Sequence, residues 1–268
     1  MQKLGVNIDA LEDFESPRLK NDYKDTLKLI SNLGFKAIFS DMTFLKPPEE
    51  IAECSAALNL EYQFVHAPFK NINDIWCEGL NGDDILKTLC NSAETCSRAN
   101  VPIMVVHVSS GFTPPPISDI GAERFKKLID LSSNKNVKIA FENLRVPSYL
   151  DWAMNTFKDN SMVGFCWDIG HENCFTRDIE YMSLYGERLL CTHIHDNKKE
   201  LGRDLHLIPF DGKINYNKVA NHLKNSDFSG PLMLEVFAKD NIYKDISLVD
   251  FYTKAYNSIE KIRQLTLE

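Results

Sequence analysis

Histidine and acidic residues recur at the ends of short apolar runs along this 268-residue chain. Glu142 follows Ile139-Ala140-Phe141, and Glu235 follows Leu232-Met233-Leu234. A carboxylate in such a position would be costly to bury without a partner. Six of the seven histidines belong to the same set, and only His222 lies outside it. The full set comprises His66, His107, Glu142, Asp168, His171, His193, His195, Asp204, His206 and Glu235.

Imidazole and carboxylate groups that converge on one point form sites suited to Zn²⁺, Mn²⁺ or similar divalent ions. Each residue alone has an ordinary structural explanation. A histidine at a strand end can be a satisfied polar group, a lone glutamate can be half of a buried ion pair, and Asp168 can cap a helix. Their recurrence at corresponding ends of consecutive strands is harder to explain independently, and it predicts bound metal.

The elements that would carry these residues alternate along the chain. Strand-like runs start about every 25 to 43 residues, the length of a βα unit, and helical apolar periodicity fills the intervals. Runs such as Ile103-Met104-Val105-Val106 are apolar on successive residues, as strands buried on both faces are. The predicted strands are 4–8, 37–40, 62–66, 103–108, 138–142, 163–168, 189–195 and 232–236. The predicted helices are 23–33, 48–58, 82–99, 119–132, 148–159, 177–186, 215–225 and 247–265.

Eight alternating units without a linker or a change of composition indicate one domain, residues 1–268, folded as a single (β/α)8 TIM barrel of the α/β class. A doubly wound open sheet is the alternative, but no GxGxxG motif follows the first strand. In a parallel barrel the C-terminal strand ends meet at one mouth, where active sites of this fold are built. The histidines and acids would converge there.

Composition limits the partners of the chain. The formal net charge of −8 weakens, without excluding, binding to a nucleic acid. The seven cysteines include no CxxC pair, so thiolate zinc and thioredoxin-like redox chemistry are not expected. Residues 1–6 run into a strand without a signal-peptide core, and no apolar run reaches the length of a membrane helix. We therefore expect a cytoplasmic protein with no membrane partner.

The ordered site residues resemble those of the xylose-isomerase-like barrel superfamily, which includes sugar isomerases, sugar epimerases and endonuclease IV. The resemblance covers essentially the whole chain. It rests on His66, His107, Glu142, Asp168-x-x-His171, His193-x-x-Asp196, Asp204-x-His206 and Glu235. It implies a central metal site formed by Glu142, Asp168, His193 and Glu235.

The resemblance to endonuclease IV, which holds three zinc ions, implies two further sites. His66 and His107 would hold a second ion, with Glu142 bridging it to the first. His171, Asp204 and His206 would hold a third. Simple epimerases of the superfamily keep only the central four residues, so the implied cofactor is one to three divalent ions per chain, Zn or Mn.

The implied function is that of a metal-dependent isomerase or epimerase of a small sugar or sugar phosphate. Glu142 and Glu235 would act as base and acid on opposite sides of the reacting carbon, and the metal would stabilise the enediolate. The family form selects His193 as the ligand on strand seven, paired with Asp196, which leaves His195 facing the substrate or supporting the site. The expected substrate contacts are His195, Phe69, Trp167 and Lys199, the last in a basic loop beside the site.

The alternative function is that of an endonuclease IV-like zinc-cluster phosphodiesterase acting on abasic DNA or another phosphate ester. The complete ligand set favours it. The acidic charge and the isomerase-like segments 66–69 and 141–147 oppose it, as does the lack of a loop that joins clustered basic residues to an aromatic wedge. A lyase or dehydratase, and a non-catalytic binding module, are further alternatives. Many relatives associate, so the resemblance leaves a homo-oligomer open.

Overall fold

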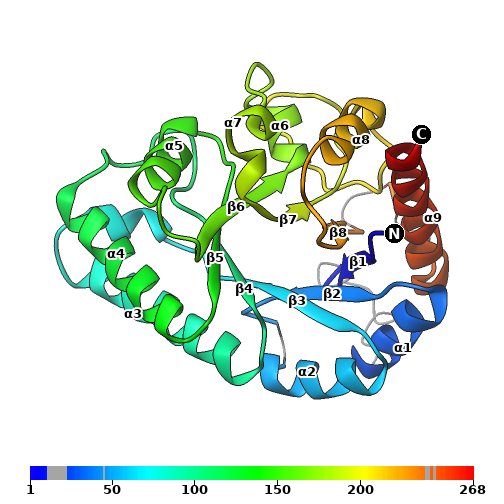
Figure 1. Ribbon diagram of the computed structural model, residues 1–268, viewed down its shortest axis with the longest axis horizontal. Coiled ribbons are helices and arrows are strands. Elements are labelled where there is room, and N and C mark those ends of the chain that lie inside the picture. The colour runs from blue at the N-terminus through cyan, green and yellow to red at the C-terminus, as the bar shows by residue number, and fades with distance from the viewer. Residues whose placement is uncertain (11–22, 45, 239–241, 244–245) are drawn as a thin grey trace.

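The structure is a computed structural model that describes residues 1–10, 23–44, 46–238, 242–243 and 246–268. Its strands are arranged side by side with helices around them (Figure 1). The eight strands are β1 (Leu4–Asn7), β2 (Ala37–Asp41), β3 (Glu61–His66), β4 (Ile103–Val106), β5 (Lys138–Glu142), β6 (Val163–Asp168), β7 (Leu189–His193) and β8 (Leu232–Leu234). Each lies within or across one of the predicted runs.

The strands form a parallel barrel. They pair in the order β7-β6-β5-β4-β3-β2-β1-β8, and every pairing is parallel. Backbone hydrogen bonds join the two ends of this order: Ile194 N–H donates to the Met233 carbonyl at 2.8 Å, and Glu235 N–H donates to the Ile194 carbonyl at 3.1 Å. The predicted (β/α)8 barrel is therefore confirmed, and the open-sheet alternative is wrong.

The helices follow the strands in sequence, with two departures from prediction. The α-helices are α1 (Tyr23–Leu33), α2 (Pro48–Ala57), α3 (Leu80–Arg98), α4 (Asp119–Asn134), α5 (Pro147–Thr156), α6 (Ile169–Phe175), α7 (Tyr181–Tyr185), α8 (Tyr216–Lys224) and α9 (Leu248–Leu267). The predicted helix 177–186 is only the short α7 followed by the 3-10 turn Gly186–Arg188, and neither α6 nor the 3-10 helix η2 (Ile72–Trp76) was expected. In the described part of the chain, no helix has the length and apolar character needed to cross a membrane.

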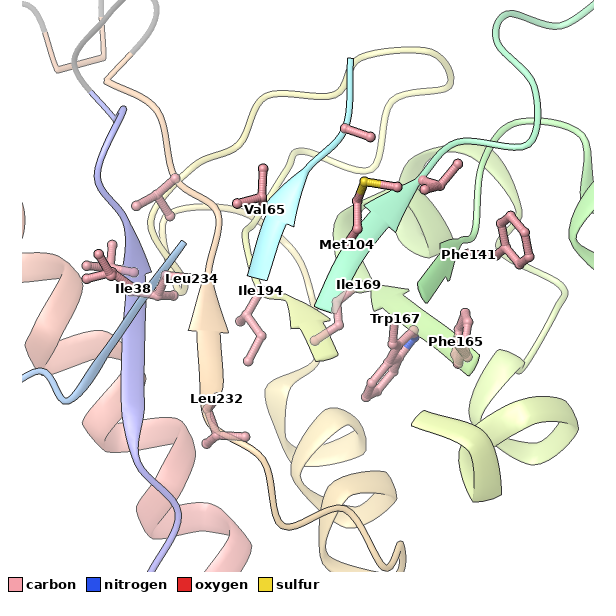
Figure 2. Packing of buried hydrophobic residues seen from close by; sticks show 14 of the residues in the cluster. Ile38, Val65, Met104, Phe141, Phe165, Trp167, Ile169, Ile194, Leu232 and Leu234 are labelled. Carbon is pink, nitrogen blue, oxygen red and sulfur yellow. The ribbon is translucent and has the colours of Figure 1, made fainter. Parts of the chain in front are cut away.

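Alternation along each strand divides the core into two layers. In β6, Phe165 and Trp167 pack between the strands and the helices, as Figure 2 shows, whereas Cys166 faces the barrel interior. Asp168, two residues beyond Cys166, shares its inward side because side chains alternate along a strand. The inner layer consists of Ala37, Phe39, Phe64, Ile103, Val105, Ala140, Cys166, Cys191 and Met233.

This inner layer forms a packed floor beneath the barrel mouth. The rings of Phe39 and Phe64 stack with centroids 4.3 Å apart, and Phe39 also stacks on the imidazole of His193 at 5.3 Å. Gly5 in β1 leaves the space that Met233 occupies, since a Cβ there would lie 2.1 Å from the Met233 sulfur. The packed inner layer therefore fixes the position of the His193 ring, which stacks on Phe39.

Candidate metal centre

The histidines and acids predicted from the sequence meet at the C-terminal mouth of the barrel. The described residues contain four groups whose candidate ligand atoms lie within 4.8 Å of one another. These groups are Glu142–Asp168–His193–Glu235, His66–His107–Glu142, His171–Asp204–His206 and His195–His206–Glu235. The first three are the groupings that the sequence suggested, and the fourth was not expected.

Glu142 lies between two of these groups. Its Oε1 atom is 3.0 Å from Nδ1 of His193 and 3.4 Å from Nδ1 of His171. Its Oε2 atom is 2.7 Å from Nε2 of His107 and 3.3 Å from Nε2 of His66. The carboxylate is almost fully buried. Each of its oxygens therefore faces a different set of imidazoles.

Asp168 is held rigidly from several sides. Its Oδ1 atom accepts a hydrogen bond from the backbone N–H of His171 at 2.6 Å, which caps the start of α6. The Asn143 side chain accepts from the backbone N–H of Asp168 and donates to its carbonyl, both at 2.8 Å. The helix-cap explanation of Asp168 is thus confirmed, and the same carboxylate belongs to a candidate metal group.

The third group depends on the long loop after β7. Oδ2 of Asp204 lies 2.9 Å from Nε2 of His171 and 3.0 Å from Nε2 of His206. Asp196 folds this loop by accepting backbone hydrogen bonds from Phe210, Gly212 and Ile214 at 3.0–3.1 Å. Asp196 is held by these loop contacts and lies outside the four groups, so of the motif His193-x-x-Asp196 only His193 belongs to a candidate metal group.

His195 occupies a different place from His193. Nε2 of His195 lies 3.0 Å from Oδ1 of Asp168, and its ring stacks on that of His206 at 4.0 Å. The side chain is fully buried and does not line the cavity. His195 therefore supports Asp168, and the expectation of a substrate-facing His195 is corrected because its ring is buried against Asp168 and His206, outside the cavity lining.

The residues present fit a divalent cation. The carboxylates of Glu142, Asp168 and Glu235 are buried, with ligand atoms within 4.8 Å of one another, and such charges need a compensating cation. Buried Oδ1 of Asp204 has no hydrogen-bond partner among the described residues. The donors are imidazole nitrogens and carboxylate oxygens, a set that suits Zn²⁺ and Mn²⁺.

Without metal, protons take the place of that cation. Burial lowers the pKa of His193, but the facing carboxylates of Glu235 and Glu142 outweigh it and raise the pKa to about 10. The same balance, with Asp204 as the main partner, raises the pKa of His206 to about 9. Burial raises the pKa of Glu142, yet His193 and His107 hold it well below its usual range. The Glu142 carboxylate therefore stays ionised.

A cavity of about 290 Å³ opens above the centre, near the lower end of small-molecule sites. Both glutamates of the central group line it, whereas Asp168 and His193 do not. The lining residues are Asp9, Phe39, Asp41, Thr43, His66, Phe69, His107, Glu142, Arg145, His171, Asp204, His206, Glu235 and Phe237.

Of the other expected substrate contacts, Phe69 lines the cavity, whereas Trp167 and Lys199 do not. Phe69 lines the cavity, is 43% exposed and stacks on the ring of His107 at 4.4 Å. Trp167 does not line the cavity, because it points outward from β6, where its indole N–H donates to Glu172 at 2.8 Å. Lys199 is exposed on the loop after β7 and also lies away from the cavity lining. The expectations for Trp167 and Lys199 are therefore corrected.

Three charged lining residues were missed. Asp9 follows β1 and Asp41 ends β2, and the Asp41 backbone N–H donates a hydrogen bond to the Asp9 carboxylate at 3.0 Å. Burial raises the pKa of Asp9 to about 6. The rule that found the other acids, an acid just beyond the end of a strand, would have found these two. Arg145 lies in the loop after β5, and no strand pattern points to it.

Comparison with known proteins places this geometry in a family. A family model described as Xylose isomerase-like TIM barrel matches residues 27–254. The chain belongs to this family. Its curated relatives include the uncharacterised protein y4fM of Sinorhizobium fredii, 28% identical over 170 residues (58% of this chain and 52% of that protein). Another is the uncharacterised protein MJ1311 of Methanocaldococcus jannaschii, 23% identical over 190 residues (64% of this chain and 63% of that protein). The alignments thus span about half to just under two thirds of these relatives' lengths.

Solved structures share the fold over nearly the whole chain. A D-tagatose 3-epimerase-like protein superposes with a TM-score of 0.74 at 21% identity, over 99% of this chain and 98% of that one. The D-psicose 3-epimerase of Clostridium cellulolyticum, solved with D-tagatose, gives 0.75 at 13% identity over 98% and 99%. The IOLI protein, solved with a zinc atom, gives 0.78 at 19% identity over 97% of each chain. At these identities the likeness establishes the barrel fold.

Proposed function

We propose that the protein is a divalent-metal-dependent isomerase or epimerase of a small sugar or sugar phosphate. The proposal rests on one observation: two residues of the central group are buried beneath the cavity, and the other two line it. Asp168 and His193 are fully buried beneath the cavity, whereas Glu142 and Glu235 reach its lining. In the proposal Asp168 and His193 hold the ion, and the carboxylates of Glu142 and Glu235 also meet the substrate. The structural similarity to a D-tagatose 3-epimerase-like protein and to a D-psicose 3-epimerase supports the substrate class.

The central group would hold the ion through Glu142, Asp168, His193 and Glu235. A bound divalent ion supplies Lewis acidity toward a carbonyl and the neighbouring hydroxyl of the sugar. The rigid support of Asp168 by Asn143 and His195 keeps these ligands in one arrangement. The chain's remaining task is to remove a proton from the carbon beside the carbonyl and to return one.

The two glutamates are placed for that proton transfer. Glu142 ends β5 and Glu235 follows β8, so they approach the cavity from strands that are three places apart in the barrel. Glu142 is kept ionised by His193 and His107, which lower its pKa, and it can therefore accept a proton. Epimerisation requires access to both faces of one carbon, and a second carboxylate on another strand provides it.

Incorporation of solvent deuterium tests the proposal. Protein loaded with Mn²⁺ or Zn²⁺ is incubated with a panel of ketoses in ²H₂O, and exchange at the carbon beside the carbonyl is followed by NMR. We expect exchange with at least one ketose and its loss, by about 10²-fold or more, in Glu235→Gln. Glu61→Gln is the matched control, because Glu61 lies at the start of β3, where it pairs with Lys3. Unchanged exchange in Glu235→Gln would contradict the proposal.

A zinc-cluster phosphoesterase is the second candidate, and the position of Glu142 favours it. The two carboxylate oxygens of Glu142 face different imidazoles, and all three members of the group His171–Asp204–His206 lie close together. Metal analysis separates the candidates: the isomerase requires about one ion per chain, and the hydrolase two to three. Cleavage of a duplex with an abasic site, abolished by His206→Ala, would establish the hydrolase and overturn our preference.

A further inference from the structure

We propose that Arg145 binds an anionic group of the substrate, a phosphate or a carboxylate, and thereby makes the centre selective for acidic sugars over neutral ones. The inference rests on the proposed function and narrows its substrate class. Arg145 lies in the loop between β5 and α5, three residues after Glu142, and its side chain lines the cavity.

Arg145 differs in charge from the rest of the lining. The other ionisable lining residues are five carboxylates and four imidazoles: Asp9, Asp41, Glu142, Asp204, Glu235, His66, His107, His171 and His206. Among the lining residues of the described chain, Arg145 is the one lysine or arginine. A guanidinium is therefore the fixed cation that a ligand meets beside the metal centre.

The guanidinium of Arg145 has no polar partner among the described residues. Its Cζ atom lies 4.2 Å from the centroid of the Phe175 ring and 5.8 Å from that of Phe112. By contrast, buried Arg124 donates to Ile75, Cys77, Gly79 and Asp83. Stacking against an aromatic face orients a guanidinium while leaving its N–H edge open, and that edge matches the oxygens of phosphate and carboxylate.

The charges of the cavity also give the ligand a direction. In the closed strand order, β5 lies opposite β1, with three strands between them on either side. Asp9 follows β1 and Asp41 ends β2, so the wall facing Arg145 carries carboxylates. Carboxylates repel an anion and accept hydrogen bonds from hydroxyls. A sugar acid would therefore place its hydroxyl end toward Asp9 and Asp41 and its anionic end toward Arg145.

The basic loop after β7 is the competing anion site, and it is less well placed. Lys199 is exposed, and Arg203 is paired with Glu200 at 2.7 Å. Neither lines the cavity. Arg203 is therefore a matched control: it is an arginine of the same mouth region that the inference leaves without a role in binding.

Calorimetric titration of Mn²⁺-loaded protein tests the inference without requiring turnover. The probes are D-fructose, D-fructose 6-phosphate and D-gluconate, which carry no anion, a phosphate and a carboxylate. We expect tighter binding of an anionic probe than of fructose, and the anionic probe with the lower Kd identifies the group. Arg145→Gln should weaken that probe by about 10- to 100-fold and change fructose by less than about twofold.

Two variants complete the design. Arg145→Lys should fall between wild type and Arg145→Gln, because it keeps the charge and loses the planar fork. Arg203→Gln should match wild type. Metal content and thermal unfolding of each variant confirm an intact centre. Equal binding of the anionic probes by wild type and Arg145→Gln, equal or tighter binding of fructose by wild type, or binding of none of the probes would each overturn the inference. Arg145-dependent binding without deuterium exchange into any ketose would instead count against the proposed isomerase and leave the anion site standing.

Discussion

Oε2 of Glu142 lies 2.7 Å from Nε2 of His107, while Oε1 of the same carboxylate lies 3.0 Å from Nδ1 of His193. One side chain at the end of β5 thus joins imidazoles from β7 and from just beyond β4. Glu142 belongs to two candidate metal groups, so its loss should affect both of them.

Glu142→Ala should abolish activity and lower the metal content of the purified protein, because both groups lose the carboxylate that they share. The backbone should stay folded for two reasons. The stacked rings of Phe39 and Phe64 in the inner layer are unchanged, and residue 142 pairs with Cys166 of β6 through its backbone rather than its side chain. Metal per chain by mass spectrometry and far-UV circular dichroism measure the two effects. Glu61→Ala is the control. Full turnover by Glu142→Ala would show that the site has been assigned to the wrong residues.

Metal uptake should release protons. In the metal-free protein the pKa of His193 is about 10 and that of His206 about 9, so both rings hold a proton at pH 7. A ring nitrogen must lose its proton to bind metal, and apparent affinity should therefore rise with pH up to these values and fall below neutrality. Titration in two buffers of different ionisation enthalpy counts the released protons. A count of zero at pH 7 would refute the protonated resting state.

His195 should act on metal affinity through Asp168. His195→Gln removes the imidazole that lies 3.0 Å from Oδ1 of Asp168, and loss of such a supporting group typically weakens metal binding by about 10- to 100-fold. The matched control is His222→Gln, because His222 lies on α8 and belongs to no metal group. Competition with a fluorescent chelator measures the affinity. Equal affinity in the two variants would show that His195 is only a packing residue.

Gly170 should tolerate no side chain. A Cβ at this position would lie 1.9 Å from Cε1 of His195, so Gly170→Ala must push the ring away from Asp168. Overpacking of this kind costs about 1–3 kcal/mol of unfolding free energy. Gly186→Ala is the control, since its nearest neighbour would be the flexible end of Met182 at 3.3 Å. Urea unfolding compares them, and equal midpoints for the two variants would contradict the prediction.

Chelation should destabilise the protein. The buried carboxylates of Glu142, Asp168 and Glu235 lie within one group, and a bound cation offsets their repulsion. An ion present at 100 times its dissociation constant stabilises the folded state by about 2.7 kcal/mol. The unfolding temperature should therefore fall in EDTA and recover with added Mn²⁺ or Zn²⁺. An unfolding temperature that is the same in both conditions would mean that the acids are balanced without metal.

The barrel could be predicted because its strands repeat a strong local signal. Apolar runs such as 103–106 and 232–234 are buried on both faces, and each ends near a polar residue. The short elements were lost for the opposite reason. The seven residues of α6 and the five of η2 are too few to show a helical period. Register shifts also lie beyond the pattern, as at Phe165 and Cys166 in β6.

The candidate ligands could be predicted because they lie at the ends of strands, where the inward-facing side chains reach the barrel mouth. The errors arose where this rule was not applied to every strand. Trp167 precedes Asp168, so it had to face the helices, and Asp9 and Asp41 satisfied the rule and were passed over. The position of Arg145 could not be predicted in this way. It depends on where a loop side chain turns, and that is decided by the ring of Phe175, thirty residues away in sequence.

The most direct test of the centre is an anomalous difference map from a crystal soaked in Mn²⁺. A peak at about 2.0–2.3 Å from side-chain atoms of Glu142, Asp168, His193 and Glu235 is the expected result. Density for the ion elsewhere on the molecule, with these four side chains bound only to one another, would contradict the proposal that they meet in order to hold a metal.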